Sequence, residues 1–171
     1  MKPSVEIVVA DASPLIALAR LDALHLLPAL FSRAWMTETV LAECCAGSVR
    51  RECTAIRTAI GAGQLGVRPT PAHPAWTVDP GEASAIAAAL ELSAGIIMDD
   101  RAGRRLAGHL GLPVVGTLGI RVLAKRARLL SEIGPSVAAL AASGYYLADR
   151  VIESALRLVG ESPLSASDAS S

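Results

Sequence analysis

Five carboxylates lie at positions where a folded chain of this type does chemistry. Each comes directly after a short apolar run or in a helical segment next to one; they are Asp11, Glu43, Glu82, Asp99 and Asp100. Acids that met at one place would repel one another unless a cation lay between them. Carboxylate oxygens suit Mg²⁺ or Mn²⁺, which keep several waters and use few protein ligands. The pattern therefore predicts a site for one of these divalent cations.

The elements that must position these acids alternate along the chain. Short apolar runs predict strands near 5–10, 34–36, 65–68, 96–98 and 113–115. Helical patterns fill the intervals, near 13–21, 24–30, 37–47, 50–62, 81–93, 102–110, 118–128, 135–142 and 148–159. Ser13 followed by Pro14 predicts the N-cap and first position of the first helix. Strands that alternate with helices imply an α/β fold, with a parallel sheet covered on both faces.

This arrangement brings the acids to one edge of the sheet. Asp11 ends the first expected strand, and Asp99 and Asp100 end the fourth. Glu43 belongs to the helix after the second strand, and Glu82 opens the helix before the fourth. In open α/β sheets, ligands bind outside the carboxyl ends of the strands, where the strand order reverses. We therefore expect carboxylates from four segments to meet there.

Each acid also has an explanation that needs no ligand. Asp11 can cap the helix that follows it, and Asp99 with Asp100 can cap another. Glu82 in a first helical turn favours the helix dipole, and Glu43 alone is an ordinary surface acid. Only the combination indicates a metal site.

Positive charge is concentrated after the last two acids. Sixteen basic residues balance sixteen acidic ones, so a general attraction to nucleic acid is absent and any basic face is local. Residues 101–128 hold seven basic side chains and no acid: Arg101, Arg104, Arg105, Arg121, Lys125, Arg126 and Arg128. Such clusters hold phosphate backbones. The alternatives are a solvated helix face and a site for an acidic partner.

Composition excludes several classes of protein. With 52% hydrophobic residues in 171, the chain is not a disordered one. Only 3% of residues are aromatic, which disfavours a base-stacking surface. Mean hydropathy is +0.45, but no apolar run approaches the roughly 18 residues of a membrane span. Glu6 and Asp11 interrupt the first apolar run, unlike a signal peptide. We expect a cytoplasmic protein with no membrane partner, one domain over 1–161 and a disordered tail over 162–171.

Two further patterns carry no chemistry. Residues 61–66 match GxGxxG, but a helical segment precedes them and an extended one follows, so we interpret the glycines as a helix stop and turn. Cys44, Cys45 and Cys53 suit neither a disulfide framework nor a CxxC site, because their number is odd and two are adjacent. We expect all three to act as small unpaired hydrophobic residues.

Five segments, in this order, resemble PIN-domain proteins. They are Val8–Leu18 with its DxSPLIxL pattern, Val40–Glu43, Gly81–Ala87, Ile97–Arg104 and Gly116–Gly119. More narrowly, they look like the VapC-related branch of predicted nucleic-acid-binding PIN proteins. The resemblance covers about residues 5–161.

The resemblance implies a five-stranded parallel sheet in an α/β/α sandwich and divalent-metal-dependent ribonuclease activity. Many members are toxins held by a small antitoxin, and homodimers are common. By motif position, Asp11, Glu43, Glu82 and one of Asp99 and Asp100 take the acidic roles, although many relatives have Asp at the position of Glu82. Because side chains alternate along a strand, only one of the adjacent pair points inward unless the chain has already turned. We favour Asp100.

The first hypothesis is therefore a Mg²⁺- or Mn²⁺-dependent endoribonuclease of the toxin type, with one or two ions. The ion would orient and acidify a water for in-line attack on phosphorus. Asp11 and Asp100 (or Asp99) are the expected primary ligands, with Glu43 and Glu82 binding directly or through water. The supporting residues that we expect are Ser13 and Thr117 as hydrogen-bond donors, and Arg101, Arg104 and Arg105 as contacts to the RNA backbone.

Two other hypotheses remain open. One is a non-catalytic module of the same fold that binds RNA or an antitoxin. The other is a small-molecule α/β hydrolase of the phosphatase type; there a second aspartate would follow Asp11 by two positions, where this chain has Ser13. The helical segments over 135–159 either close the domain or cover a groove for a dimer or antitoxin, and we favour core packing.

Overall fold

The computed structural model describes residues 5–47 and 50–162. Nearly all of the expected tail, residues 163–171, lies outside the described residues, so the prediction of disorder stays a prediction. In the described part of the chain, no helix is both long enough and apolar enough to span a membrane.

Across the described residues, five parallel strands form one sheet in the order β3-β2-β1-β4-β5. The strands are β1 (Ile7–Ala10), β2 (Arg33–Thr37), β3 (Gly66–Arg68), β4 (Gly95–Ile97) and β5 (Val114–Val115). Central β1 pairs with β2 on one side and β4 on the other, Val9 lying opposite both Trp35 and Ile96. The strand order reverses at β1, so the carboxyl ends of β1 and β4 are adjacent. The predicted α/β fold with a five-stranded parallel sheet is confirmed.

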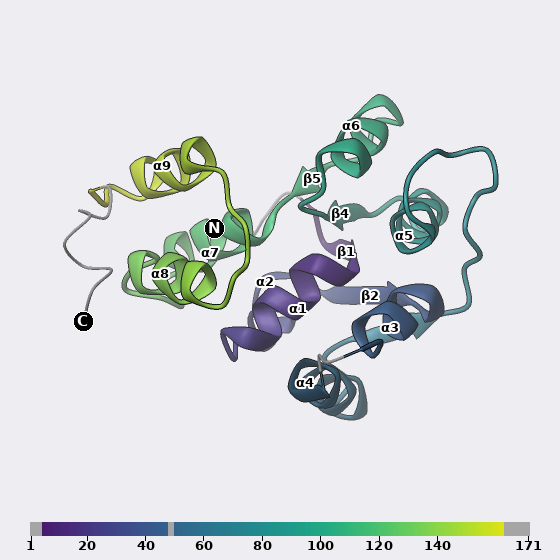
Figure 1. Cartoon of the computed structure of the whole chain (residues 1–171), viewed down its shortest axis with the longest axis horizontal. Helices are drawn as coiled ribbons and strands as arrows, with labels where there is room; N and C mark the ends of the chain where they lie inside the picture. Colours follow the sequence, from purple (N-terminus) through teal and green to yellow (C-terminus); the bar gives the residue numbers. More distant parts are fainter. Residues whose placement is uncertain (1–4, 48–49, 163–171) are drawn as a thin grey trace.

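Helices cover both faces of the sheet (Figure 1). They are α1 (Ala12–Arg20), α2 (Leu26–Leu30), α3 (Glu38–Cys44), α4 (Arg50–Gly61), α5 (Pro80–Glu91), α6 (Arg101–His109), α7 (Thr117–Arg126), α8 (Gly134–Ala142) and α9 (Asp149–Leu158). In Figure 1, α7, α8 and α9 gather at the left, α3 and α5 lie at the right, and α1 runs between the two groups.

Two apolar clusters hold these layers together. The larger one surrounds the central strands, where Val9, Ile96 and Ile97 are fully buried. Strands buried on both faces read as continuous apolar runs, which is why the sequence predicts them well. The smaller cluster joins α1, α7, α8 and α9 through residues such as Leu118, Leu140 and Leu156. The C-terminal helices therefore pack on the domain, as we favoured.

The capping and turn residues of the sequence mark some ends of the helices correctly and one incorrectly. Thr37 caps α3, its side chain accepting the backbone N–H of Val40 at 3.1 Å. Residues 61–66 run from the end of α4 into β3, as the turn interpretation requires. The N-cap prediction for Ser13 is wrong: α1 begins at Ala12, and the residue at the N-cap is Asp11.

The prediction of unpaired cysteines is wrong for two of the three. Cys45 and Cys53 form a disulfide, while Cys44 is free and buried as expected. Gly47, with φ of +68°, turns the chain after α3. That turn brings the Cα atoms of Cys45 and Cys53 to 4.9 Å, within the range of a disulfide. Spacing along the sequence does not reveal such a reversal.

Candidate active site

Asp11 lies at the point where β1 passes into α1. Its backbone N–H donates to the carbonyl of Ile97 at 3.0 Å, which extends the pairing of β1 with β4. Although Asp11 occupies the N-cap position, its side chain makes no capping hydrogen bond. The residue is 3% exposed, and its Oδ1 is buried without a partner. Helix capping therefore does not explain this acid, and a buried carboxylate oxygen without a partner is costly.

The other four predicted acids converge on Asp11. Burial is the main cause that raises the pKa of Asp11 from 3.8 to about 6; the backbone N–H of Ala12 lowers it, and the negative charges of Glu43, Asp99 and Asp100 raise it. Burial likewise raises the pKa of Glu82 to about 7, with contributions from Asp100 and Asp11. The repulsion shows that carboxylates from α3, α5 and the end of β4 are near Asp11, as predicted. Among the described residues, none of the five forms an ion pair with a basic side chain.

Glu43 is held by the N-terminus of α5. The backbone N–H of Gly81 donates to its Oε1 at 2.9 Å. A Cβ at position 81 would collide with the same carboxylate, so only glycine allows this approach. Burial raises the pKa of Glu43, the Gly81 N–H lowers it, and Asp79 raises it. The contact places Glu43 beside the helix turn that carries Glu82.

Glu82 and Asp100 both lie close to Gly103 in α6. Oδ1 of Asp100 caps α6 by accepting the N–H groups of Ala102 at 2.7 Å and Gly103 at 3.0 Å. A Cβ on Gly103 would lie 3.2 Å from Oε2 of Glu82 and would collide with the sulfur of Met98. Glycine therefore lets α6 approach the buried Glu82. Capping accounts for one oxygen of Asp100 and leaves the other open to a ligand.

Asp99 is the most strongly hydrogen-bonded of the acids. Its Oδ1 accepts the backbone N–H of Thr117 at 2.9 Å, and its Oδ2 accepts the hydroxyls of Thr117 and Tyr145. Burial, followed by the charge of Asp99, raises the pKa of Tyr145, so its phenol stays protonated and donates. The sequence predicts a hydrogen-bonding role for Thr117 but not for Tyr145, because nothing local distinguishes Tyr145 from its neighbour Tyr146.

The choice between Asp99 and Asp100 rested on strand alternation, which does not apply here. β4 ends at Ile97, so the chain has left the strand before either aspartate. Both carboxylates add to the field at Asp11. Both remain candidate ligands.

The residues fit a hydrated divalent cation. In the described ranges, 5–47 and 50–162, no three acidic, histidine or cysteine side chains are arranged to enclose a metal ion by themselves. However, in these same ranges the buried Oδ1 of Asp11 has no hydrogen-bond partner, and the acids around it form no ion pair with a basic side chain. Mg²⁺ and Mn²⁺ bind such oxygens through few protein ligands and complete their shell with water. A dication would supply the missing partner of Asp11.

Comparison with known proteins identifies the family. A family model described as a PIN domain matches residues 7–161. This chain belongs to the PIN-domain family.

Among solved structures, it is similar to a PilT N-terminus domain protein from the hyperthermophilic archaeon Sulfolobus solfataricus P2. The TM-score is 0.54 and the identity 18%, over 70% of this chain and 92% of that one. At this identity, the likeness shows the fold. No curated protein matches the chain. PIN domains are generally nuclease-like, whereas membership of the VapC-related branch stays a prediction.

A cleft of about 1140 Å³ adjoins the acids of this PIN domain. Asp99 and Asp100 lie in its wall with Ser13, and Arg101 and Arg104 of α6 also line it. Arg104 is steadied by donating to the carbonyl of Met98 at 2.7 Å. The cleft thus combines cationic side chains with the acidic cluster.

The predicted basic run does not form one face. Arg105 lines a separate hollow of about 400 Å³ beside Trp76. Arg121 is buried and donates to Ser136, and Lys125 pairs with Glu161 at 2.6 Å, so these two have structural roles. Arg150 of α9, which was not among the predicted residues, joins Arg101 and Arg104 in the larger cleft. Arg150 lies far along the chain from Arg101 and Arg104, so no local pattern in the sequence groups it with them.

Proposed function

We propose that this PIN-domain protein is a Mg²⁺- or Mn²⁺-dependent endoribonuclease of the toxin type. The observation that carries the proposal concerns the buried Oδ1 of Asp11 and the acids around it: among the described residues, this oxygen has no hydrogen-bond partner and these acids have no basic one. In a protein without a ligand, such a cluster is unfavourable. A bound dication makes it favourable, which gives the arrangement a physical reason.

Each acid has a distinct proposed role. Asp11, Glu82, Asp99 and Asp100 hold the ion, directly or through water, and Thr117 orients Asp99 by binding both of its oxygens. Glu43, fixed by the N–H of Gly81, receives a proton from or positions the attacking water. When bound, the ion would acidify that water and offset negative charge on the leaving oxygen.

RNA is the proposed substrate, and the cleft beside the acids is its proposed binding site. Arg101, Arg104 and Arg150 line the cleft and would contact consecutive phosphates, and the exposed Ser13, which also lines it, would donate its hydroxyl to one. Arg105 lies on the neighbouring hollow and would contact RNA only beyond the cleft.

The experiment is an RNA digestion titrated with Mn²⁺, with EDTA as the blank and Asp11→Asn as the test variant. We expect the parent to cut only with metal and Asp11→Asn to cut at most a hundredth as fast. Asp22→Asn is the matched control, because Asp22 is an exposed acid that follows the far end of α1 from Asp11 and pairs with Arg51. If Asp11→Asn cuts like the parent, the proposed metal site is wrong.

One observation favours a second candidate, a PIN module that binds RNA without cutting it. The described acids do not by themselves enclose a metal ion. Under this alternative the same digestion would show RNA bound but intact at every Mn²⁺ concentration.

The toxin role includes a small antitoxin and a homodimer as proposed partners. Val151 and Leu158 of α9 are exposed beside the cleft and offer an apolar surface to such a protein. Co-expression with the product of any short neighbouring gene, followed by size-exclusion chromatography, tests both partners.

A further inference from the structure

The carboxylate of Asp99 is bonded from two separate parts of the chain. Thr117 opens α7, directly after β5, and belongs to the sheet edge. Tyr145 lies between α8 and α9 and packs in the smaller apolar cluster with residues such as Leu140. From that cluster, the hydroxyl of Tyr145 donates a hydrogen bond to Oδ2 of Asp99. The C-terminal helices thereby reach the acidic site.

The backbone at Tyr145 is set by the end of α8. Gly144, with φ of +77°, takes the left-handed conformation that ends many helices. Its N–H donates to Ala141 and the next N–H, of Tyr145, donates to Leu140, each at 3.1 Å. These two bonds form a Schellman motif, which fixes where the Tyr145 side chain begins.

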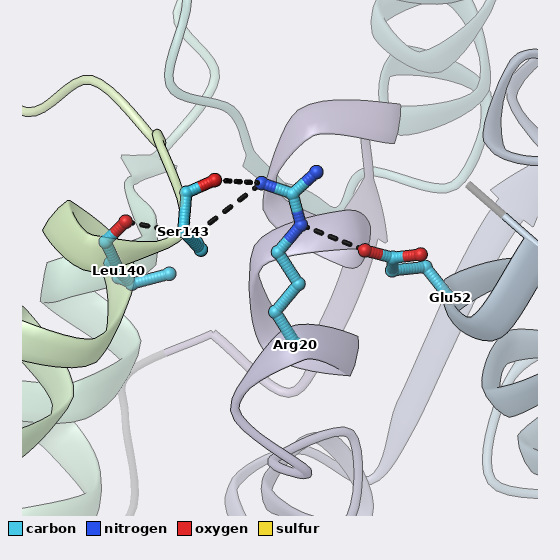
Figure 2. A network of polar contacts seen from close by, with 4 residues as sticks. All are labelled: Arg20, Glu52, Leu140 and Ser143. Atoms are coloured by element: carbon cyan, nitrogen blue, oxygen red, sulfur yellow. Dashed lines mark hydrogen bonds and ion pairs between the residues drawn. The ribbon is translucent and has the colours of Figure 1, made fainter. Parts of the chain in front are cut away.

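A second contact ties the same turn to α1 (Figure 2). Arg20, the last residue of α1, donates through Nη1 to the carbonyl of Ser143 at 3.3 Å and to its hydroxyl at 3.4 Å. Its Nε donates to Glu52 of α4 at 2.8 Å. Because α1 begins directly after Asp11, one helix positions Asp11 at its start and, through Ser143, the turn that holds Tyr145 at its end.

We infer that Tyr145 is a positioning residue, which orients the Asp99 carboxylate for the metal and makes the docking of α8 and α9 part of the active site. The inference rests on the proposed function. Partners that bind a ligating carboxylate set its orientation, and their loss typically lowers metal affinity or activity by about 10–100-fold. Without the phenol, Oδ2 of Asp99 loses one of its two hydroxyl donors and keeps that of Thr117.

The test compares Tyr145→Phe with Tyr146→Phe. Each removes one hydroxyl and keeps the ring, but Tyr146 is 87% exposed, and the hydroxyl bonded to Asp99 is that of Tyr145. Mn²⁺ binding is measured by electron paramagnetic resonance of the free ion, without RNA, and kcat and KM are measured separately. Thermal unfolding of both variants verifies that they fold.

We expect the Mn²⁺ Kd of Tyr145→Phe to rise about tenfold or more, with kcat reduced, the KM for RNA unchanged, and Tyr146→Phe binding Mn²⁺ like the parent. Arg20→Gln, which releases Ser143, should shift the Kd in the same direction by a smaller factor. If the parent binds Mn²⁺ and Tyr145→Phe binds it equally well, this inference fails while the proposed function stands. If the parent neither binds Mn²⁺ nor cuts RNA, the proposed function fails and this inference with it.

Discussion

Replacing Asp11 by Asn should stabilise the metal-free protein while it destroys the site. Asp11 is 3% exposed, its Oδ1 has no partner, and acids surround it. At neutral pH its negative charge therefore opposes folding in the absence of a cation. Asn has the same shape and no charge, and the neighbouring carboxylates can accept its amide hydrogens.

The magnitude follows from the pKa of Asp11, which rises from 3.8 to about 6 on folding. Each pKa unit corresponds to about 1.4 kcal/mol, so ionised Asp11 lowers the free energy of unfolding by on the order of 3 kcal/mol above pH 7. Burial of the Asn amide offsets part of this, which leaves a net gain of about 1–3 kcal/mol. Because the folded pKa is the higher one, this destabilisation is absent well below pH 3.8, grows between pH 3.8 and about 6, and is constant at higher pH.

The assay is urea unfolding in EDTA at pH 4.5 and pH 8, for the parent, Asp11→Asn and the control Asp22→Asn. The gain of Asp11→Asn should be nearly complete at pH 8 and small at pH 4.5, and Asp22→Asn should show none. Added Mn²⁺ should stabilise the parent at pH 8 by mass action and leave Asp11→Asn unaffected. A variant less stable than the parent at pH 8 in EDTA would refute the reasoning.

Three more predictions concern α6, the cleft and the disulfide. Gly103→Ala should destabilise the protein by about 1–3 kcal/mol through overpacking and lower cleavage, whereas Gly108→Ala, on the same helix facing open space, should stabilise it by up to about 1 kcal/mol. Arg101→Ala should raise the KM for RNA and reduce the slope of log binding constant against log salt concentration by about one. Arg157→Ala, on α9, should change neither quantity. Cys53→Ser should lower the free energy of unfolding by about 2–3 kcal/mol, the loop-closure value, and leave the Mn²⁺ Kd unchanged.

Each of these has an outcome that contradicts it. Equal stability of Gly103→Ala and Gly108→Ala would mean that α6 does not approach α5 as closely as described. An unchanged salt dependence for Arg101→Ala would mean that this side chain does not contact the RNA backbone. A Cys53→Ser protein as stable as the parent would mean that the disulfide does not constrain the unfolded chain.

Local patterns in the sequence were sufficient to predict the elements. Buried parallel strands such as β4 are continuous apolar runs, and Thr37 marks the start of α3 by a capping bond within one turn. The positions of Asp11, Asp99 and Asp100 at strand ends followed from the same local reading. Parallel strands end at a common edge, so the convergence of these acids was predictable as well.

Only the tertiary structure decided which groups complete the site. Tyr145 reaches Asp99 from 46 residues away, Arg150 enters the cleft from α9, and Cys45 finds Cys53 across a chain reversal. It also decided that the Asp11 side chain does not cap its helix and that its Oδ1 has no hydrogen-bond partner among the described residues. Periodicity and capping are set by neighbours within a turn or two, whereas such contacts depend on how separate helices dock. That docking depends on the whole apolar core, so no local sequence pattern at the residues that it brings together predicts their contact.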